Sequence, residues 1–250
     1  MIEIPPLFAH RGCSIRAPEN TIAAFKLAEE SGILGIELDV HLALSGEPVV
    51  IHDDNLLRTG RIDRLVESMS LEELSNIDIG SWFDAAFRNE RLPTLTQVFD
   101  SLGSGAFFDI ELKSKTNENW KLVNAVADVI RRHDVMNRCV VSSFNPYAIR
   151  AFHKVEPAIP VGLIYAKLPV IPRYLRRGQA AFFTKCSLVK PQFKQTGRIA
   201  LAYQQKLRHR RVAAWTVDDI ADAERLFASG VDSIISNKPE EFLSLLDQYR

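Results

Sequence analysis

A chain of 250 residues with 46% hydrophobic and 25% charged side chains is long enough to bury one large core without disulfides or a structural metal. This composition excludes disordered, collagen-like and coiled-coil proteins. The 31 basic and 31 acidic side chains cancel, which argues against general electrostatic binding of nucleic acid.

The charges are unevenly distributed along the chain. Residues 157–217 contain 12 Lys or Arg and no Asp or Glu, so the other 189 residues hold 19 basic and 31 acidic side chains. A positive face of this kind suits an anionic substrate or an anionic membrane surface. Solvated side chains that point in several directions would give the same count, so peripheral membrane contact stays an open alternative.

Cysteine usage and hydropathy predict the compartment. Cys13, Cys139 and Cys186 are odd in number and have no zinc-site or C-x-x-C spacing, which is typical of free thiols in a reducing compartment. No basic segment followed by an apolar one opens the chain, and the uncharged stretch 157–166 is half the length that a bilayer requires. We therefore expect a soluble, cytoplasmic protein without stable membrane insertion; the sequence leaves its oligomeric state open.

Short runs rich in Val, Ile and Phe alternate with amphipathic stretches, which is the pattern of βα units around a buried parallel sheet. The predicted strands are 7–10, 34–40, 48–52, 107–113, 139–144, 161–165, 187–190, 212–217 and 233–236. Further helices are expected at 119–133, 219–228 and 239–249.

Helix-capping residues mark three more helices. Asn20 or Thr21 can cap a helix that ends near Gly32, because both residue types favour the N-cap position and glycine favours the C-terminal stop. Ser70 with Glu73, and Thr94 with Gln97, have the capping-box spacing.

Two segments depart from a regular βα repeat. Residues 42–47 are too few for a helical crossover, so the chain either turns a hairpin at Ser45-Gly46 or returns irregularly. Residues 54–92 have weak periodicity and indicate an insertion after the third strand. We expect one domain over 1–250 that carries this insertion.

Charged side chains stand at or just after the ends of four predicted strands. They are His10, Arg11, Glu37, Asp39, His52, Asp53, Glu111 and Lys113. A spacing of two places Glu37 with Asp39, and Glu111 with Lys113, on one face of a strand. In α/β barrels the catalytic groups come from the C-terminal ends of the strands, so four strands direct these side chains to one mouth.

The residue types indicate phosphoryl-ester chemistry. Three carboxylates, Glu37, Asp39 and Glu111, form an oxygen-rich site that suits Mg²⁺ or Ca²⁺, with Mn²⁺ possible, better than Zn²⁺. Arg11 and Lys113 would bind an anion with two non-bridging oxygens. The imidazoles of His10 and His52 would exchange protons near neutral pH. Each residue taken singly is more often structural; their joint placement is what favours a site.

These residues and further motifs make the chain similar to the glycerophosphodiester phosphodiesterase family. The motifs occur over nearly the whole chain and in the family's order: His10-Arg11-Gly12, Pro18-Glu19-Asn20-Thr21, Glu37-Leu38-Asp39-Val40, Val50-Ile51-His52-Asp53, Leu57-Arg58-Thr59, Leu92-Pro93-Thr94-Leu95, Ile110-Glu111-Leu112-Lys113 and Trp215-Thr216-Val217.

The resemblance implies a TIM (β/α)8 barrel with a small insertion after the strand that ends in His52. It implies hydrolysis of a small glycerophosphodiester to glycerol 3-phosphate and an alcohol with one divalent cation. Residue by residue, it assigns metal binding to Glu37, Asp39 and Glu111, acid–base catalysis to His10 and His52, and substrate contacts to Arg11, Lys113, Phe144 and Trp215.

Departures from the family pattern leave alternatives open. The turn before the third strand is Ser45-Gly46, and Ser236-Asn237-Lys238-Pro239 replaces a usual Thr-Asp-x-Pro. A lysophospholipase D-like enzyme at membrane surfaces and a catalytically silent binding module are the alternative functions. Attack by water and attack by the glycerol 2-hydroxyl are both compatible with the residues.

Other chemically notable residues have structural interpretations. We expect Glu19 to act at a helix N-terminus and His41 to lie at the surface or at the end of a helix. Phe182 and Phe183 are expected in the core.

Overall fold

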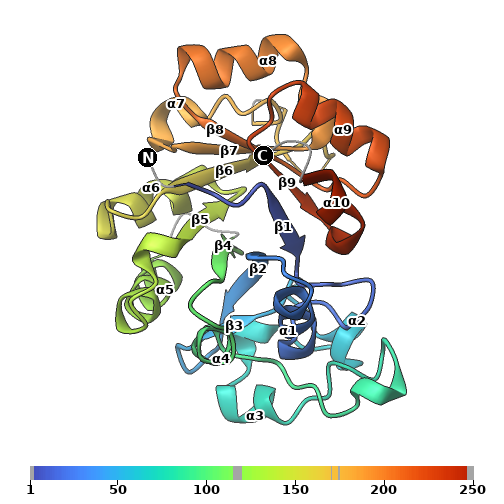
Figure 1. The fold of residues 1–250 in the computed structure, drawn as a ribbon. Helices are drawn as coiled ribbons and strands as arrows, with labels where there is room; N and C mark the ends of the chain where they lie inside the picture. The colour runs from blue at the N-terminus through green and yellow to red at the C-terminus, as the bar shows by residue number, and fades with distance from the viewer. Residues whose placement is uncertain (1–2, 115–119, 170, 174, 247–250) are drawn as a thin grey trace.

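The computed structural model describes residues 3–114, 120–169, 171–173 and 175–246, and eight parallel strands close into a barrel within it (Figure 1). They pair in the order β1, β2, β4, β5, β6, β7, β8, β9, and β9 pairs with β1. Their bounds are β1 Leu7–His10, β2 Gly35–Leu42, β4 Phe107–Leu112, β5 Cys139–Ser143, β6 Val161–Tyr165, β7 Leu188–Pro191, β8 Arg211–Ala214 and β9 Ser233–Ser236. The predicted TIM barrel is confirmed.

The third predicted strand, at 48–52, forms a hairpin with β2 and is not one of the eight barrel strands. β3 (Pro48–Val50) runs antiparallel to β2, and Gly46 takes a φ of 102° in the turn between them. The hairpin alternative at Ser45-Gly46 is therefore the observed one. β3 ends at Val50, so the expectation that this strand continues to His52 is wrong. The backbone N–H of Ile51 still donates to the carbonyl of Asp39 on β2 at 3.0 Å, and the chain leaves β2 after this contact.

Helices cover the outside of the barrel (Figure 1). They are α1 Ile22–Glu30, α4 Leu95–Ser101, α5 Trp120–Arg132, α6 Pro146–Val155, α7 Ala181–Thr184, α8 Arg198–Ala202, α9 Ile220–Ala228 and α10 Leu243–Leu246. Single helical turns are η3 Met136–Arg138, η4 Phe193–Gln195, η5 Tyr203–Leu207 (a π-turn) and η6 Pro239–Phe242. The predicted helix ends at residues 119 and 247–249 lie outside the described residues.

The predicted caps form as their spacing indicates. Thr21 is the N-cap of α1, and its hydroxyl accepts a hydrogen bond from the N–H of Ala24 at 3.2 Å. Gly32, with a φ of 79°, follows the end of this helix. Both capping boxes, at Ser70 and Thr94, are present. Asn20, the other N-cap candidate, is instead directed to the site described below.

Residues 54–92 carry no barrel strand and build a small second core. This insertion contains α2 Leu57–Gly60, η1 Val66–Ser68, α3 Leu71–Ser75 and η2 Ala85–Phe87. Val66, Leu74 and Ile77 pack with Val49 and Ile51 of the β3 region. Burial of these apolar side chains attaches the insertion to the mouth of the barrel.

The strand pleat divides each barrel strand into an inner and an outer face. On β4, Phe108 and Ile110 pack in the outer core between sheet and helices, whereas Phe107 packs in the core inside the barrel. Asp109 and Glu111 alternate with the outer residues and share the inner face of Phe107. The barrel interior is therefore apolar near the N-terminal ends of the strands and charged toward their C-terminal ends.

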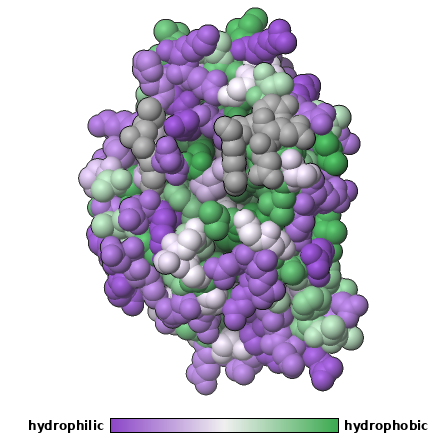
Figure 2. Space-filling view, viewed as in Figure 1, coloured by the Kyte–Doolittle hydropathy of each residue, from purple (hydrophilic) through white to green (hydrophobic). Residues whose placement is uncertain are grey.

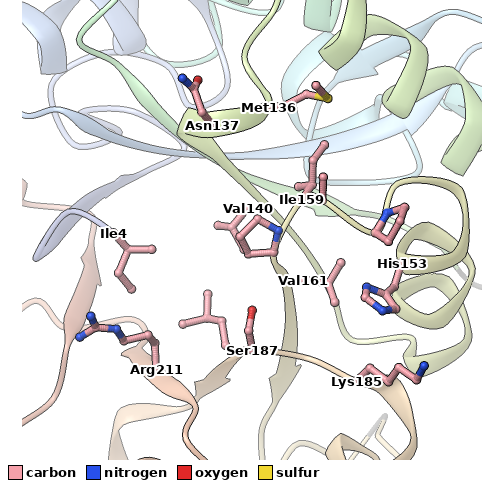
Figure 3. A pocket seen from close by; sticks show the side chains of 14 residues that line it. Ile4, Met136, Asn137, Val140, His153, Ile159, Val161, Lys185, Ser187 and Arg211 are labelled. Carbon is pink, nitrogen blue, oxygen red and sulfur yellow. The ribbon is translucent and has the colours of Figure 1, made fainter. Parts of the chain in front are cut away.

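A cavity of about 470 Å³ lies at the N-terminal ends of β5 to β8 (Figure 3). Arg211 and Ser187 stand on one side of it, with His153 and Lys185 on the other. The charged interior opens at the opposite end of the barrel. No helix among the described residues is long and apolar enough to span a bilayer.

Candidate active site

β2 and β4 bring the three carboxylates that the sequence predicts as metal ligands together. Asp39 and Glu111 are direct neighbours in the register of these strands, and Glu37 stands two residues earlier on the same face of β2. All three side chains are buried, and one oxygen from each lies within 4.8 Å of the others. Carboxylate oxygens this close form a set of hard ligands that can hold a divalent cation.

The carboxylates differ in their electrostatic surroundings. Burial raises the pKa of Glu37 well above its ordinary value, and the charge of Asp39 adds to this effect. Burial acts in the same direction on Asp39, but Lys113 and Arg11 hold the pKa of Asp39 well below its usual range. Asp39 thus has close protein cations, whereas Glu37 gains most from an added one.

Both predicted anion-binding residues contact this cluster. The Lys113 ammonium lies 2.9 Å from Oδ1 of Asp39 and 2.8 Å from Oε1 of Glu111. Arg11 follows β1 with a φ of 60° and places Nε 3.3 Å from Oδ2 of Asp39. Asn20 supports the same carboxylate by donating from Nδ2 to Oδ2 of Asp39 at 2.8 Å. These cations stand where they can also contact phosphate oxygens.

A side-chain amide orients His10. Nδ1 of His10 lies 2.6 Å from Oδ1 of Asn237, whose Nδ2 donates to Asp218 at 2.7 Å. Because Asp218 binds the amide nitrogen, the amide oxygen accepts a hydrogen from Nδ1 of His10, and Nε2 of the neutral ring keeps its lone pair. Burial, and next the charge of Arg11, lower the pKa of His10 to about 4, so the ring is neutral at pH 7.

A carboxylate orients His52. Nδ1 of His52 lies 2.7 Å from Oδ1 of Asp53, and Oδ2 of Asp53 accepts from Nε of Arg58 at 2.6 Å. Arg58, on α2 of the insertion, also donates to both carboxylate oxygens of Glu19, at 2.7 and 2.9 Å. Glu19 in turn accepts from Arg11 at 2.9 Å. The expected helix-end role of Glu19 is therefore wrong, since this carboxylate pairs with two arginines at the mouth of the barrel.

One cavity of about 180 Å³ collects the predicted residues. It is lined by His10, Arg11, Glu37, His52, Glu111, Lys113, Phe144, Ile164, Leu168, Lys190, Trp215 and Ile235. Eight of the nine predicted site residues are among them, and the ninth, Asp39, contacts Arg11 and Lys113. The rings of Phe144 and Trp215 meet edge to face with centroids 5.5 Å apart and form an apolar wall.

Sequence reasoning missed the lysine at the floor of this cavity. Lys190 on β7 is buried, with its ammonium 2.7 Å from Oδ2 of Asp109 and 3.0 Å from the hydroxyl of Ser142. A charged residue inside the apolar run Leu188-Val189-Lys190 is the signal that could have identified it, because an unpaired buried charge is costly. No local signal marks Asn237, whose partner His10 is 227 positions away.

Two expectations for residues outside the cavity are wrong. His41 is buried on β2, where its Nε2 lies 3.1 Å from the carbonyl of His52, because the strand continues past the predicted end. Phe182 and Phe183 are 62% and 42% exposed, since Ala181 and Thr184 form the buried side of α7 and the two rings lie on its outer side.

Fold and site together define an α/β-barrel enzyme whose pocket combines clustered carboxylates, three cations and two imidazoles. A family model described as the glycerophosphoryl diester phosphodiesterase family matches residues 10–241. The chain belongs to this family, and it is a phosphodiesterase.

Individual relatives agree over the full length of the chain. A glycerophosphodiester phosphodiesterase of Caldanaerobacter subterraneus subsp. tengcongensis is 36% identical over 241 residues, which are 96% of this chain and 97% of that protein. A phosphodiesterase of Oleispira antarctica, solved with the product sn-glycerol-3-phosphate, is 29% identical with a TM-score of 0.87, covering 98% of this chain and 97% of that one. A glycerophosphodiester phosphodiesterase of Agrobacterium tumefaciens is 26% identical with a TM-score of 0.80, and the match covers 98% of this chain and 100% of that one.

Proposed function

We propose that the protein hydrolyses small glycerophosphodiesters to glycerol 3-phosphate and an alcohol, with one divalent cation and two histidines. The observation that carries this proposal is the convergence of carboxylates, cations and both imidazoles on one cavity. The product bound to the related Oleispira antarctica enzyme supports glycerol 3-phosphate as the product here.

Glu37, Asp39 and Glu111 would hold the cation. Their fit to a hard ion rests on the donor set, because all three ligands are carboxylate oxygens within 4.8 Å and Glu37 has the raised pKa of an acid short of positive charge. A cation held there would supply positive charge that stabilises the negative charge of the phosphate in the transition state. Mg²⁺ and Ca²⁺ are the first candidates, with Mn²⁺ as a third.

The histidines would divide the proton transfers. Nε2 of His10 keeps a lone pair toward the pocket, so His10 accepts the proton of the attacking hydroxyl. The Asp53 carboxylate, 2.7 Å from Nδ1 of His52, orients this ring, and His52 would donate a proton to the leaving alkoxide. The attacking hydroxyl belongs either to water or to the glycerol C2 position, and proximity favours the internal group.

Arg11 and Lys113 would hold the phosphate and the aromatic wall would receive the glycerol or alcohol carbons. Both cations already contact carboxylates at 2.8 to 3.3 Å, so a bound phosphodiester would share them with Asp39 and Glu111. Phe144 and Trp215 offer their apolar surfaces on the side of β5 and β8.

A substrate panel tests this function. Glycerophosphocholine and glycerophosphoethanolamine are incubated with the purified protein and Mg²⁺, Mn²⁺ or Ca²⁺ in turn, and release of glycerol 3-phosphate is measured. We expect release with at least one metal and loss of release after chelation. No release from any diester would contradict the proposed substrate class, and full activity after exhaustive chelation would contradict the metal site.

A further inference from the structure

Three short helical segments leave apolar side chains exposed on one outer side of the barrel. They are α7, α8 and η5, which follow β6 and β7, and we call their exposed surface the α7–α8 face. Phe182, Phe183, Ile199 and Leu207 on these segments are 62%, 42%, 89% and 67% exposed. Clustered exposure of large apolar side chains is unusual on a free protein surface and indicates a contact surface.

A groove joins these side chains to cations. Phe182 and Ile199 line the same cavity of about 640 Å³ as Lys167, Arg177 and Lys194. The guanidinium of Arg208, the residue that follows η5, lies 4.8 Å from the ring centroid of Phe182 on α7. Residues 157–217, which contain the whole face, include no Asp or Glu to neutralise it.

We propose that the α7–α8 face docks the protein on an anionic lipid surface. Aliphatic and aromatic tips beside lysines and arginines are the combination that inserts into the interface and pairs with lipid phosphates. Figure 2 shows hydrophobic and hydrophilic side chains side by side at the end of the molecule that α8 occupies in Figure 1. A second copy of the chain fits this face poorly, because a two-fold contact would set cations against cations.

Nucleic acid also fits less well than lipid. Ile199 and Leu207, the two most exposed apolar residues of the face, have no ring on which a base could stack. Their burial in the acyl region of a bilayer would remove apolar surface from water. An anionic membrane would therefore interact with both the cations and the aliphatic side chains of the face.

The face also adjoins the mouth of the active site. Lys167 lines its groove, and the next residue, Leu168, lines the catalytic cavity. Docking would bring that mouth close to the lipid phosphates, where diesters derived from lipids are released. Docking does not depend on the hydrolysis proposed above and is measured separately from it.

A charge-reversal pair tests the proposal. The double variant Lys194→Glu/Arg198→Glu is compared with Lys26→Glu/Lys121→Glu, which makes the same change in net charge at exposed positions of α1 and α5. Binding is measured by co-sedimentation with vesicles of phosphatidylcholine alone or mixed with phosphatidylglycerol. We expect the wild type to bind only the mixed vesicles, and its affinity to fall as the salt concentration is raised. The Lys194→Glu/Arg198→Glu variant should bind the mixed vesicles at least about 25-fold more weakly than the wild type, which is roughly fivefold for each cation reversed.

A second comparison isolates the apolar contribution. Ile199→Asp should weaken vesicle binding about tenfold or more, whereas Leu44→Asp, at a position 67% exposed on the β2–β3 turn, should leave it unchanged. Circular dichroism and thermal denaturation serve as the folding control, and the spectra and Tm values should stay near wild type in all four variants. Failure of the wild type to bind anionic vesicles, equal loss in both charge variants, or binding of RNA or a second copy through this face in place of vesicles would overturn the proposal.

Discussion

The two catalytic candidates are held by chemically different partners. His10 donates from Nδ1 to a neutral amide that Asp218 fixes, whereas His52 faces the carboxylate of Asp53. The amide oxygen accepts from Nδ1 of His10, which leaves the lone pair of the ring on Nε2, and the Asp53 carboxylate fixes the orientation of the His52 ring. This asymmetry follows from the two contacts and supports one base and one acid in the pocket.

Removal of either imidazole should abolish most turnover. We expect His10→Ala and His52→Ala each to lower kcat at least about a hundredfold, which is the usual contribution of a positioned acid or base. Release of glycerol 3-phosphate measures the effect. His153→Ala, at the opposite end of the barrel, is the control and should keep near-normal activity. Near-normal rates in both site variants would refute the assignment.

The amide behind His10 should matter through ring orientation. Asn237→Ala removes the acceptor of Nδ1, and we expect kcat to fall about tenfold, the value of one hydrogen bond, with a smaller change in KM. Ser14 is a matched control, because its hydroxyl also donates to Asn237 at 3.3 Å without contacting His10. Near-normal kcat in Asn237→Ala would show that Asn237 does not act on the ring.

At the scale of elements, one arginine of the insertion joins the two sides of the pocket, and we call its contacts the clamp. Arg58 on α2 bonds to Asp53 behind His52 and to Glu19 beside Arg11, and Trp82 of the same insertion lies against its guanidinium at 5.5 Å. Only a planar group with several donors can hold two carboxylates in this way. The insertion is thus connected to the catalytic groups through charge-assisted hydrogen bonds.

Loss of this clamp should reduce activity without unfolding the barrel. We expect Arg58→Ala to lower kcat/KM about tenfold, because Asp53 and Glu19 each lose a charge-assisted contact. Steady-state kinetics with glycerophosphocholine measure the effect, and circular dichroism checks the fold. Arg64→Ala removes an exposed ion pair with Glu73 inside the insertion and should leave the rates unchanged. Similar losses in both variants would point to general destabilisation.

For the whole molecule, the charged barrel interior has a thermodynamic consequence. Glu37, Asp39, Glu111 and Asp109 are buried there beside the buried Lys190 and the half-buried Arg11 and Lys113, so carboxylates exceed cations by one. Burial raises the pKa of Glu37, and repulsion from the charge of Asp39 adds to the rise. A bound dication would reverse this imbalance and bind only to the folded barrel.

Metal should therefore raise the thermal stability of the protein. At a Mg²⁺ or Ca²⁺ concentration of about a hundred times Kd, ligand linkage adds about 2.7 kcal/mol to the free energy of unfolding. Thermal denaturation with and without metal, after treatment with a chelator, measures the shift in Tm, which we expect to be about 5 °C or more. Glu111→Gln should remove most of the shift, and Glu67→Gln, in the insertion, should not. An unchanged Tm in the wild type would contradict metal binding by the cluster.

Much of the fold was predictable because its signals are local. Alternating apolar runs, the Thr21 cap and the two capping boxes depend on neighbours within a strand or helical turn, and all are observed. The two-residue spacing likewise placed Glu37 and Asp39 on one face of β2. The extent of β2 and β3 was not predictable, because pairing with neighbouring strands sets where a strand ends.

The partners of the site residues depend on closure of the barrel. The sequence determined which candidate side chains stand at the strand ends and which face of a strand they share, since residue type and pleat are properties of the chain itself. Only the tertiary structure decided that Asn237 orients His10, that Lys190 forms the floor of the pocket, and that Arg58 joins Glu19 to Asp53. These contacts join segments that are far apart in the sequence. The segments come together only when the barrel closes through the pairing of β9 with β1, so no local sequence pattern predicts the contacts.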